Sequence, residues 1–272
     1  MIRALATLAI VLALSACAVR TPPRPAGTAG PDPSAVAAFA SATTACRGFR
    51  SLTGELSLSG RAAGERIRGR VIAGLEAGGS VRLEGVAPFG PPVFILAGTA
   101  ENATLLLPRE HRVLRDTPVA AVLERLTGLA LGADDLRLMV SGCLADNAAP
   151  HEGRQWPGGW QAVTLGPDRV AYLRLQQGRP VVVAADYGPW HVDYAEHLSG
   201  YPRVVRVRRG LGLRSLGEGG GDATTDVTAR VGELEVNTTI NPLAFTLAVP
   251  ADADPMTLAE VRSVAPLVPK EP

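Results

Sequence analysis

Alternation of apolar and polar residues limits this chain, more than any other feature, to a fold made mainly of β-strands. Leu56 and Leu58 alternate with polar residues, and the same period of two recurs around Ile67, Val81 and Val205. This period places apolar side chains on one face of a strand and polar ones on the other, as in antiparallel sheets with one face in water. Gly- and Pro-rich turns separate the segments, and about eleven such strands are predicted. The last of them is expected at Leu243 to Val249.

A helical period appears in only a few places. A helix is expected from Ser34 to no further than Gly48, and a helix pair from Pro118 to Cys143, with a short helical piece near Met256 to Val264. A twisted sheet of this size must curl, and helices with apolar faces can fill its concave side. The sequence therefore predicts a mainly β (α+β) fold, an unclosed antiparallel β-barrel with a helical plug or lid and an N-terminal helix.

The N-terminus predicts export and lipidation. Arg3 precedes an apolar run from Ala4 to Leu14, which is too short to span a bilayer but suits a signal-peptide core. The following Leu-Ser-Ala-Cys resembles a bacterial lipobox, and that resemblance implies that Cys17 becomes the lipidated first residue. Ala18 at the next position resembles the pattern of lipoproteins sent to the outer membrane. The alternatives are an ordinary signal peptide and an uncleaved anchor.

Composition then divides the chain. We predict a lipoprotein signal peptide at 1–16, the lipidated cysteine and a Pro-rich tether at 17–33, a half-barrel domain at 34–250 and an irregular C-terminal tail at 251–272. The expected location is the outer membrane, facing the periplasm, and the protein is expected to be a monomer.

Cysteine usage fits that compartment. If Cys17 carries lipid, Cys46 and Cys143 remain as an even pair where oxidation is favoured, so a disulfide between them is expected. Two buried free thiols are the alternative, because cysteine is often a small core residue.

One turn carries an unexpected residue. Pro88, Phe89 and Gly90 form the centre of a tight turn between two predicted strands, and turns normally project into water. Phe89 either folds back beneath the turn or contacts an apolar partner such as a membrane. We favour the second interpretation.

Several function classes are disfavoured. A net charge of +1 gives no support to nucleic-acid binding. The sequence lacks the Gly-x-Ser-x-Gly, His-Glu-x-x-His and Cys-x-x-Cys motifs, so no enzyme, cofactor or metal site is expected. His191 and His197 are expected in a loop. The arginines of two predicted strands, among them Arg66 and Arg206, indicate either a solvated face or attraction to anionic head groups or an acidic carrier.

Short motifs resemble a known family. The run from Arg82 to Gly90, Leu126-Thr127-Gly128-Leu129, Val140-Ser141-Gly142 and the closing pattern from Asn237 to Pro250 are similar to the LolA/LolB-like lipoprotein localization family, notably its outer-membrane receptors. The resemblance implies an unclosed barrel whose helical lid covers a site for lipoprotein acyl chains, with a soluble LolA-like carrier as partner. Phe89 stands where receptors of that family have a protruding leucine that helps insertion into the membrane.

The expected function follows from these features. We predict a lipid-anchored receptor that binds lipoprotein acyl chains and helps insert them in the outer membrane; binding of another lipid or glycolipid and a purely structural role are the alternatives. Each predicted cavity residue is equally well explained as ordinary core. The predicted lining residues are Leu56, Leu58, Val71, Leu83, Phe94, Leu96, Leu123, Leu126, Leu136, Met139 and Phe245.

Overall fold

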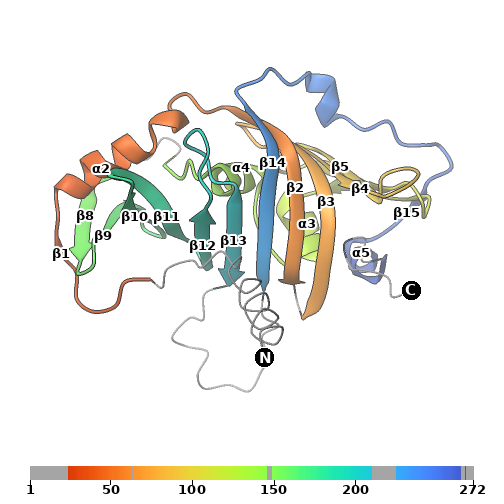
Figure 1. Cartoon of the computed structure of the whole chain (residues 1–272). Coiled ribbons are helices and arrows are strands. Elements are labelled where there is room, and N and C mark those ends of the chain that lie inside the picture. The colour runs from red at the N-terminus through yellow and green to blue at the C-terminus, as the bar shows by residue number, and fades with distance from the viewer. Residues whose placement is uncertain (1–23, 63, 146–148, 210–224, 265–266, 268–272) are drawn as a thin grey trace, which may run out of the picture.

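One curved sheet dominates the computed structural model, which describes residues 24–62, 64–145, 149–209, 225–264 and 267 (Figure 1). Fifteen strands lie in the order β1-β8-β9-β10-β11-β12-β13-β14-β2-β3-β4-β5-β6-β7-β15, and the two end strands are not neighbours, so the sheet is not closed. The predicted mainly β fold with an unclosed sheet is thus confirmed. The strands are β1 (Gly30–Pro31), β2 (Ser51–Ala62), β3 (Glu65–Glu76), β4 (Ser80–Val86), β5 (Phe94–Gly98), β6 (Ala103–Leu107), β7 (Arg112–Thr117), β8 (Glu152–Trp156), β9 (Trp160–Gly166), β10 (Arg169–Gln176), β11 (Arg179–Tyr187), β12 (Trp190–Ala195), β13 (Val204–Arg209), β14 (Asp226–Val236) and β15 (Asp254–Pro255).

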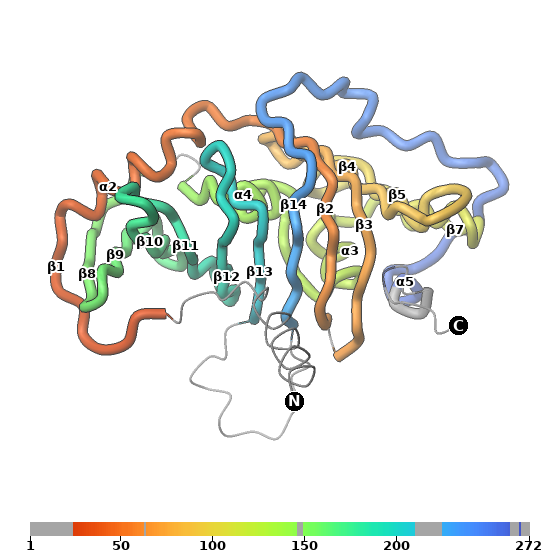
Figure 2. Tube along the Cα trace, in the orientation of Figure 1, coloured from red at the N-terminus to blue at the C-terminus, as the bar shows by residue number. Residues whose placement is uncertain are grey.

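The sheet consists of two meanders. Strands β2 to β7 form one and β8 to β14 the other, and each pairs its strands antiparallel in chain order. The pairing of β14 with β2 joins them at the centre, where Figure 2 shows the blue and orange tubes side by side. Among the strands that the structure describes, only β15, which lies beside β7, is parallel to its neighbour.

The two faces of the central strands differ as the alternation predicts. On β3 the side chains of Ile67 and Val71 are buried, whereas those of Arg66, Arg68 and Arg70 are exposed. Successive side chains of a strand point to opposite faces, so one face of these strands is apolar and covered and the other is polar and wet.

Helices cover the apolar side. In Figure 1 α3 and α4 lie behind β14, β2 and β3, and they belong to the chain that connects the two meanders. The buried face of α3 presents Val119, Val122, Leu123 and Leu126 at helical spacing. The helical segments are α2 (Ser34–Ala42), α3 (Val119–Thr127), α4 (Ala133–Ser141), α5 (Leu258–Val264) and the short 3₁₀ turns η2 (Thr44–Cys46) and η3 (Pro242–Phe245).

Several predicted strands differ from the observed ones. The prediction omitted β1, β8, β12 and β15, of which β1 and β15 have two residues each. The strand predicted at Leu243 to Val249 is wrong. Pro242 begins a 3₁₀ turn there, and the side chain of Asn241 accepts a hydrogen bond from the Leu243 amide at 3.0 Å. Leu243 is 73% exposed.

The folded unit extends beyond both ends of the predicted domain, 34–250. At the N-terminal side β1 pairs with β8, and the guanidinium of Arg24 bonds to Asp186, so the end of the predicted tether belongs to the folded unit. At the C-terminal side Met256, Val261 and Leu267 are buried in the core, although an irregular tail was expected. The predicted signal peptide and Cys17 lie outside the described residues.

Candidate functional site

A small apolar cavity lies between the concave face of the sheet and the helix pair. Its volume is about 80 Å³. It lies beneath the centre of the sheet, where the two meanders meet. The lining residues are Leu56, Leu58, Val71, Leu83, Phe94, Leu123, Leu126, Thr127, Leu129, Leu131, Leu136, Met139, Val140, Val205, Val207, Val227, Ala229 and Leu267.

The lining includes nine of the eleven residues proposed from the sequence. Leu96 is fully buried in the core but does not reach the cavity. Phe245 lies in η3, whose backbone runs close to β4 and β5. Reasoning from the sequence missed the contributions of β13 and β14, such as Val207 and Val227, although both stand in alternating segments that could have revealed them.

The described lining of the cavity offers no group for covalent chemistry. Every lining side chain is apolar except that of Thr127, whose hydroxyl donates to the Leu123 carbonyl at 2.8 Å. The lining therefore favours an apolar ligand and contributes no charge to bind a polar one.

The size of the cavity sets a further condition. An apolar cavity of about 150 Å³ suffices for benzene, and the volume here is about half of that. An apolar ligand larger than benzene therefore enters only if part of the lining moves outward. Which part is free to move depends on how each helix is held.

Helix α4 is held at both ends. Near its N-terminus Asp135 accepts hydrogen bonds from the Tyr187 hydroxyl and, at 3.4 Å, from the Arg169 guanidinium. Just beyond its C-terminus Cys143 forms a disulfide with Cys46. The helix is thus tied to β10 and β11 on one side and to the segment after α2 on the other.

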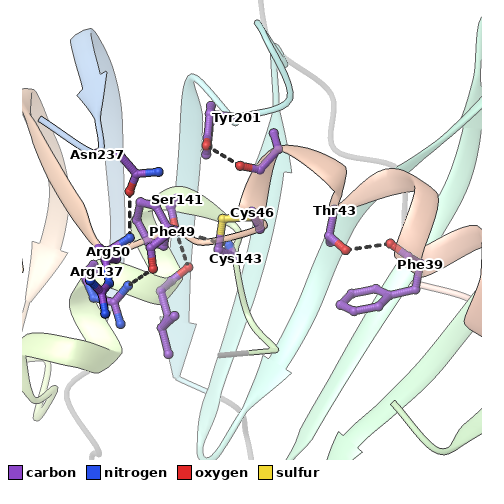
Figure 3. The surroundings of a disulfide bond; sticks show 12 residues. Phe39, Thr43, Cys46, Phe49, Arg50, Arg137, Ser141, Cys143, Tyr201 and Asn237 are labelled. Carbon is purple, nitrogen blue, oxygen red and sulfur yellow. Dashed lines mark hydrogen bonds between the residues drawn. A yellow bond between two sulfur atoms is a disulfide. The ribbon is translucent and has the colours of Figure 1, made fainter. Parts of the chain in front are cut away.

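Arg137 adds a third attachment for α4. Its side chain is 1% exposed, donates to the Phe49 carbonyl at 3.4 Å and lies with its guanidinium carbon 4.9 Å from the centre of the Phe49 ring. Figure 3 shows Arg137 and Phe49 close to the Cys46–Cys143 disulfide. Together the three attachments fix α4 against β10, β11 and the segment that leads into β2.

Helix α3 has weaker attachments. Among the helices and strands its closest packing is with α5, and it reaches the sheet through its apolar side chains across the cavity. A glycine in the left-handed conformation, Gly128 at φ 71°, ends α3 and leads into the loop before α4. Among the described residues the start of α3 is tied by the Val119 amide, which donates to the Ala100 carbonyl at 2.9 Å, and fewer polar contacts hold α3 than α4. Outward movement of α3 is therefore expected to enlarge the cavity at lower cost than movement of α4.

The predicted apolar turn is exposed. Phe89 is 88% exposed, and Pro88 and Gly90 are exposed beside it in the β4–β5 connection. Gly90 has φ 78°, a left-handed conformation that other residues rarely adopt. The ring of Phe89 therefore projects from the turn and does not fold beneath it.

A polar cluster that the sequence did not reveal lies at the edge of β11 and β12. Asp186 accepts a hydrogen bond from Tyr172 at 2.8 Å, bonds to Arg24 and lies 2.5 Å from Nδ1 of His191. Burial raises the pKa of the Asp186 carboxyl, but the Tyr172 hydrogen bond and the charges of Arg24 and His191 outweigh burial and lower it overall. No sequence signal joins Arg24 to a carboxylate so far along the chain.

The sequence indicated that His191 lies in a loop, and this prediction is wrong. It stands on β12 and faces Asp186. In the part of the chain that the structure describes, there is no group of three or more His, Cys, Asp or Glu residues arranged to hold a metal ion. Nor does any described helix combine the length and the apolar character needed to cross a membrane.

Comparisons with known proteins give similarity only at the level of structure. No family model and no curated protein matches the sequence. A LolA superfamily protein from Nitrosomonas europaea is similar in structure, with 10% identity, a TM-score of 0.44, and coverage of 80% of this chain and 98% of that one. A putative outer membrane lipoprotein-sorting protein domain from Vibrio parahaemolyticus has 9% identity, a TM-score of 0.42 and coverage of 77% and 95%. The lipoprotein LppX of Mycobacterium tuberculosis has 11% identity, a TM-score of 0.32 and coverage of 77% and 98%. Similarity at this level says nothing about the ligand, which has to be inferred from the cavity itself.

Proposed function

We propose that this protein binds acyl chains of lipoproteins in the cavity beneath α3 and helps insert them in the outer membrane, acting from a lipid anchor at Cys17 on the periplasmic side. The observation that carries the proposal is the cavity, in whose lining the described residues contribute no ionisable side chain. An acyl chain gains about 0.8 kcal/mol for each methylene removed from water. A covered apolar chamber meets that need without any covalent step.

The small volume fits a resting state. A chamber that stood open and empty would expose apolar surface to water, which costs free energy in proportion to its area. Collapse of α3 onto the sheet avoids that cost, and an entering acyl chain replaces the same contacts when α3 moves outward. Binding is then reversible, as transfer to a membrane requires.

Phe89 supplies the second element of the proposal. A ring that is 88% exposed on a fixed turn is poised to enter an apolar environment such as the acyl region of a membrane. A soluble carrier of similar fold is the expected donor of the lipoprotein. The cavity would receive its acyl chains, and the exposed ring would disturb lipid packing where they insert.

A cavity-filling variant tests the binding site. Ala229 lines the cavity from β14, so Ala229→Phe should occupy it and weaken binding of a fluorescent fatty acid at least about tenfold. Ala40→Phe, on the exposed face of α2, makes the same change outside the cavity and should bind like the parent chain. Thermal unfolding checks that both variants fold. Equal binding by a folded Ala229→Phe chain would contradict the proposal.

Cargo is tested separately. Mass spectrometry of gently extracted protein should find lipoproteins, and depletion of the protein should leave lipoproteins in the periplasm or inner membrane. If a free lipid or glycolipid is bound and lipoprotein sorting is normal, the cavity is a binding site but its cargo is not a lipoprotein. Absence of any ligand, together with failure to bind apolar dyes, would favour a structural role.

A further inference from the structure

The outer face of the central strands carries a concentration of positive charge. A groove of about 710 Å³ crosses β13, β14, β2 and β3, and its arginines are Arg61, Arg66, Arg68, Arg206 and Arg230, here called the arginine groove. The lining also contains Asp193 and Asp226, which leaves it a formal charge of +3, whereas the whole chain has a net charge of only +1. The hydroxyls of Ser59 and Thr228 lie between the arginines.

Only part of this charge is neutralised. Arg206 forms a two-point ion pair with Asp226, and Arg230 pairs with Glu196. Arg61, Arg66 and Arg68 have no carboxylate partner within the described residues. Three guanidinium groups thus remain available on neighbouring positions of β2 and β3, where Arg61 and Arg66 are direct partners in the sheet register.

The register of the sheet connects this groove to the start of the folded unit. A single transverse row of paired residues runs across six neighbouring strands: Asp186, His191, Arg208, Asp226, Arg61 and Arg66. Partners in register share one face of a sheet, and strands are about 4.8 Å apart. Asp186 binds Arg24, so the chain meets the sheet on the same face as the arginines, about 20 Å from Arg61.

The length of chain before Arg24 limits where the domain sits. Seven residue steps separate Cys17 from Arg24, which is at most about 25 Å of extended chain. A lipid on Cys17 therefore keeps Arg24, and with it this end of the outer face, close to the membrane. With a lipid on Cys17, no long flexible tether would separate the domain from the bilayer, because residues 24–33 belong to the folded unit.

We propose that the arginine groove docks on the surface of a bilayer containing anionic lipids, the same membrane that holds the anchor. The proposal rests on the lipid anchor of the proposed function. Phosphate groups of the lipids would pair with Arg61, Arg66 and Arg68. Such docking orients the domain with the outer face of its sheet on the bilayer and leaves the opposite, helix-covered side, with α3, accessible from the periplasm.

Arginine footprinting on the intact lipidated protein tests the surface. The full chain is inserted in vesicles of phosphatidylcholine alone or with phosphatidylglycerol, treated with phenylglyoxal and mapped by mass spectrometry. A basic side chain at an anionic surface gains a factor of about five, so modification of Arg61, Arg66 and Arg68 should slow about fivefold in the anionic vesicles only. High salt should restore it. Arg115 and Arg179, which are exposed elsewhere, should react equally in both.

A charge-matched pair of variants gives an independent readout. Anisotropy decay of the three tryptophans reports how freely the anchored domain tumbles. Arg61→Gln/Arg66→Gln/Arg68→Gln should tumble in anionic vesicles as the parent chain does in neutral ones. Arg47→Gln/Arg115→Gln/Arg179→Gln, which loses the same charge away from the groove, should stay immobilised.

Three results overturn the proposal: equal footprints in both vesicle types, identical tumbling of the two variants, or protection that needs an acidic protein and not anionic lipid. Failure of the proposed function is seen separately. If the Cys17 peptide carries no lipid, the prediction of a lipid anchor is wrong. Co-sedimentation of the same chain with anionic vesicles then decides whether the arginine groove binds them. If the cavity binds no acyl chain, the footprint is unaffected.

Discussion

The guanidinium of Arg109 holds the backbone of Phe89. From the β6–β7 connection it donates to the carbonyl oxygen of Phe89 at 2.6 Å and to that of Pro91 at 3.2 Å. The bonds fix the backbone of the turn while the aromatic ring stays in water. An apolar ring on a fixed backbone loses less conformational freedom on entering a membrane than a ring on a flexible loop.

Replacing Phe89 with glutamate should separate folding from insertion. Because the ring is exposed, the free energy of unfolding should change by no more than about 0.5 kcal/mol. Transfer of a lipoprotein into vesicles should nevertheless fail, since a carboxylate cannot enter the acyl region. Phe89→Leu keeps an apolar side chain and should retain most of the transfer. Loss of stability in Phe89→Glu would show instead that the ring is part of the core.

Arg109→Ala should have a weaker effect on transfer than Phe89→Glu. The variant keeps the Phe89 ring but no longer holds the backbone of the turn. The turn must then lose conformational freedom each time the ring enters the membrane, so the rate of lipoprotein transfer should fall. Hydrogen exchange of the Val93 amide, which donates to the Gly85 carbonyl at 2.9 Å at the end of the turn, should become faster. Unchanged exchange there would mean that the Arg109 bonds do not hold the turn.

The disulfide should contribute strongly to stability. Cys46 and Cys143 are 97 residues apart, and closing a loop of that length restricts the unfolded chain enough to stabilise the fold by about 2 to 5 kcal/mol. Urea unfolding of Cys46→Ala/Cys143→Ala should show this loss. Reductant should lower the stability of the parent chain to a similar level and leave the double variant unchanged, whereas a reductant-insensitive parent would contradict the prediction.

Amide exchange should distinguish the two helices of the cover. Without ligand the amides of α3 should exchange faster than those of α4, because α4 is held by Asp135, Arg137 and the disulfide. Palmitate should slow exchange in α3 by filling the cavity beneath it. If the amides of α4 exchange faster than those of α3, α4 and not α3 is the helix that moves.

Acid should release the cluster around Asp186. The folded-state pKa of Asp186 lies below its ordinary value, so the ionised carboxylate stabilises the fold above about pH 4, and this stability is lost as the pH falls through the folded-state pKa. Asp186→Asn should be less stable than the parent at pH 7, and the difference should shrink as the pH approaches 2. Thermal unfolding across this range measures it, and a difference that is independent of pH would rule out a role for the charge.

Local pattern predicted most of the sheet and failed where turns or edges interrupt it. Tyr187-Gly188-Pro189 indicated a loop, but Gly188 at φ 56° makes a tight turn and β12 begins at once at Trp190. Strand β8 has mostly exposed polar residues, so no alternation marks it. The alternation from Leu243 onward was misleading, because Asn241 and Pro242 start a 3₁₀ turn.

The cavity was partly predictable because its wall follows the alternation. Leu56, Leu58 and Val71 occupy apolar positions of strands, and such positions had to face the covered side. Whether a buried residue borders empty space depends on how the helices pack, which the pattern does not encode. Leu96 and Leu83 are register partners, yet only Leu83 reaches the cavity.

The central strand pair has a consequence for biogenesis. Leu56 pairs with Val231, 175 positions later, so β2 waits for its partner until most of the chain has been synthesised. Until then one long edge of the first meander lacks its neighbour, and closing so distant a contact is slow. An unpaired edge of this kind attracts other strands. The newly made chain is therefore exposed to aggregation until its seam closes, and we expect a helper that masks β2 to raise its folding yield more than one that acts on either meander alone.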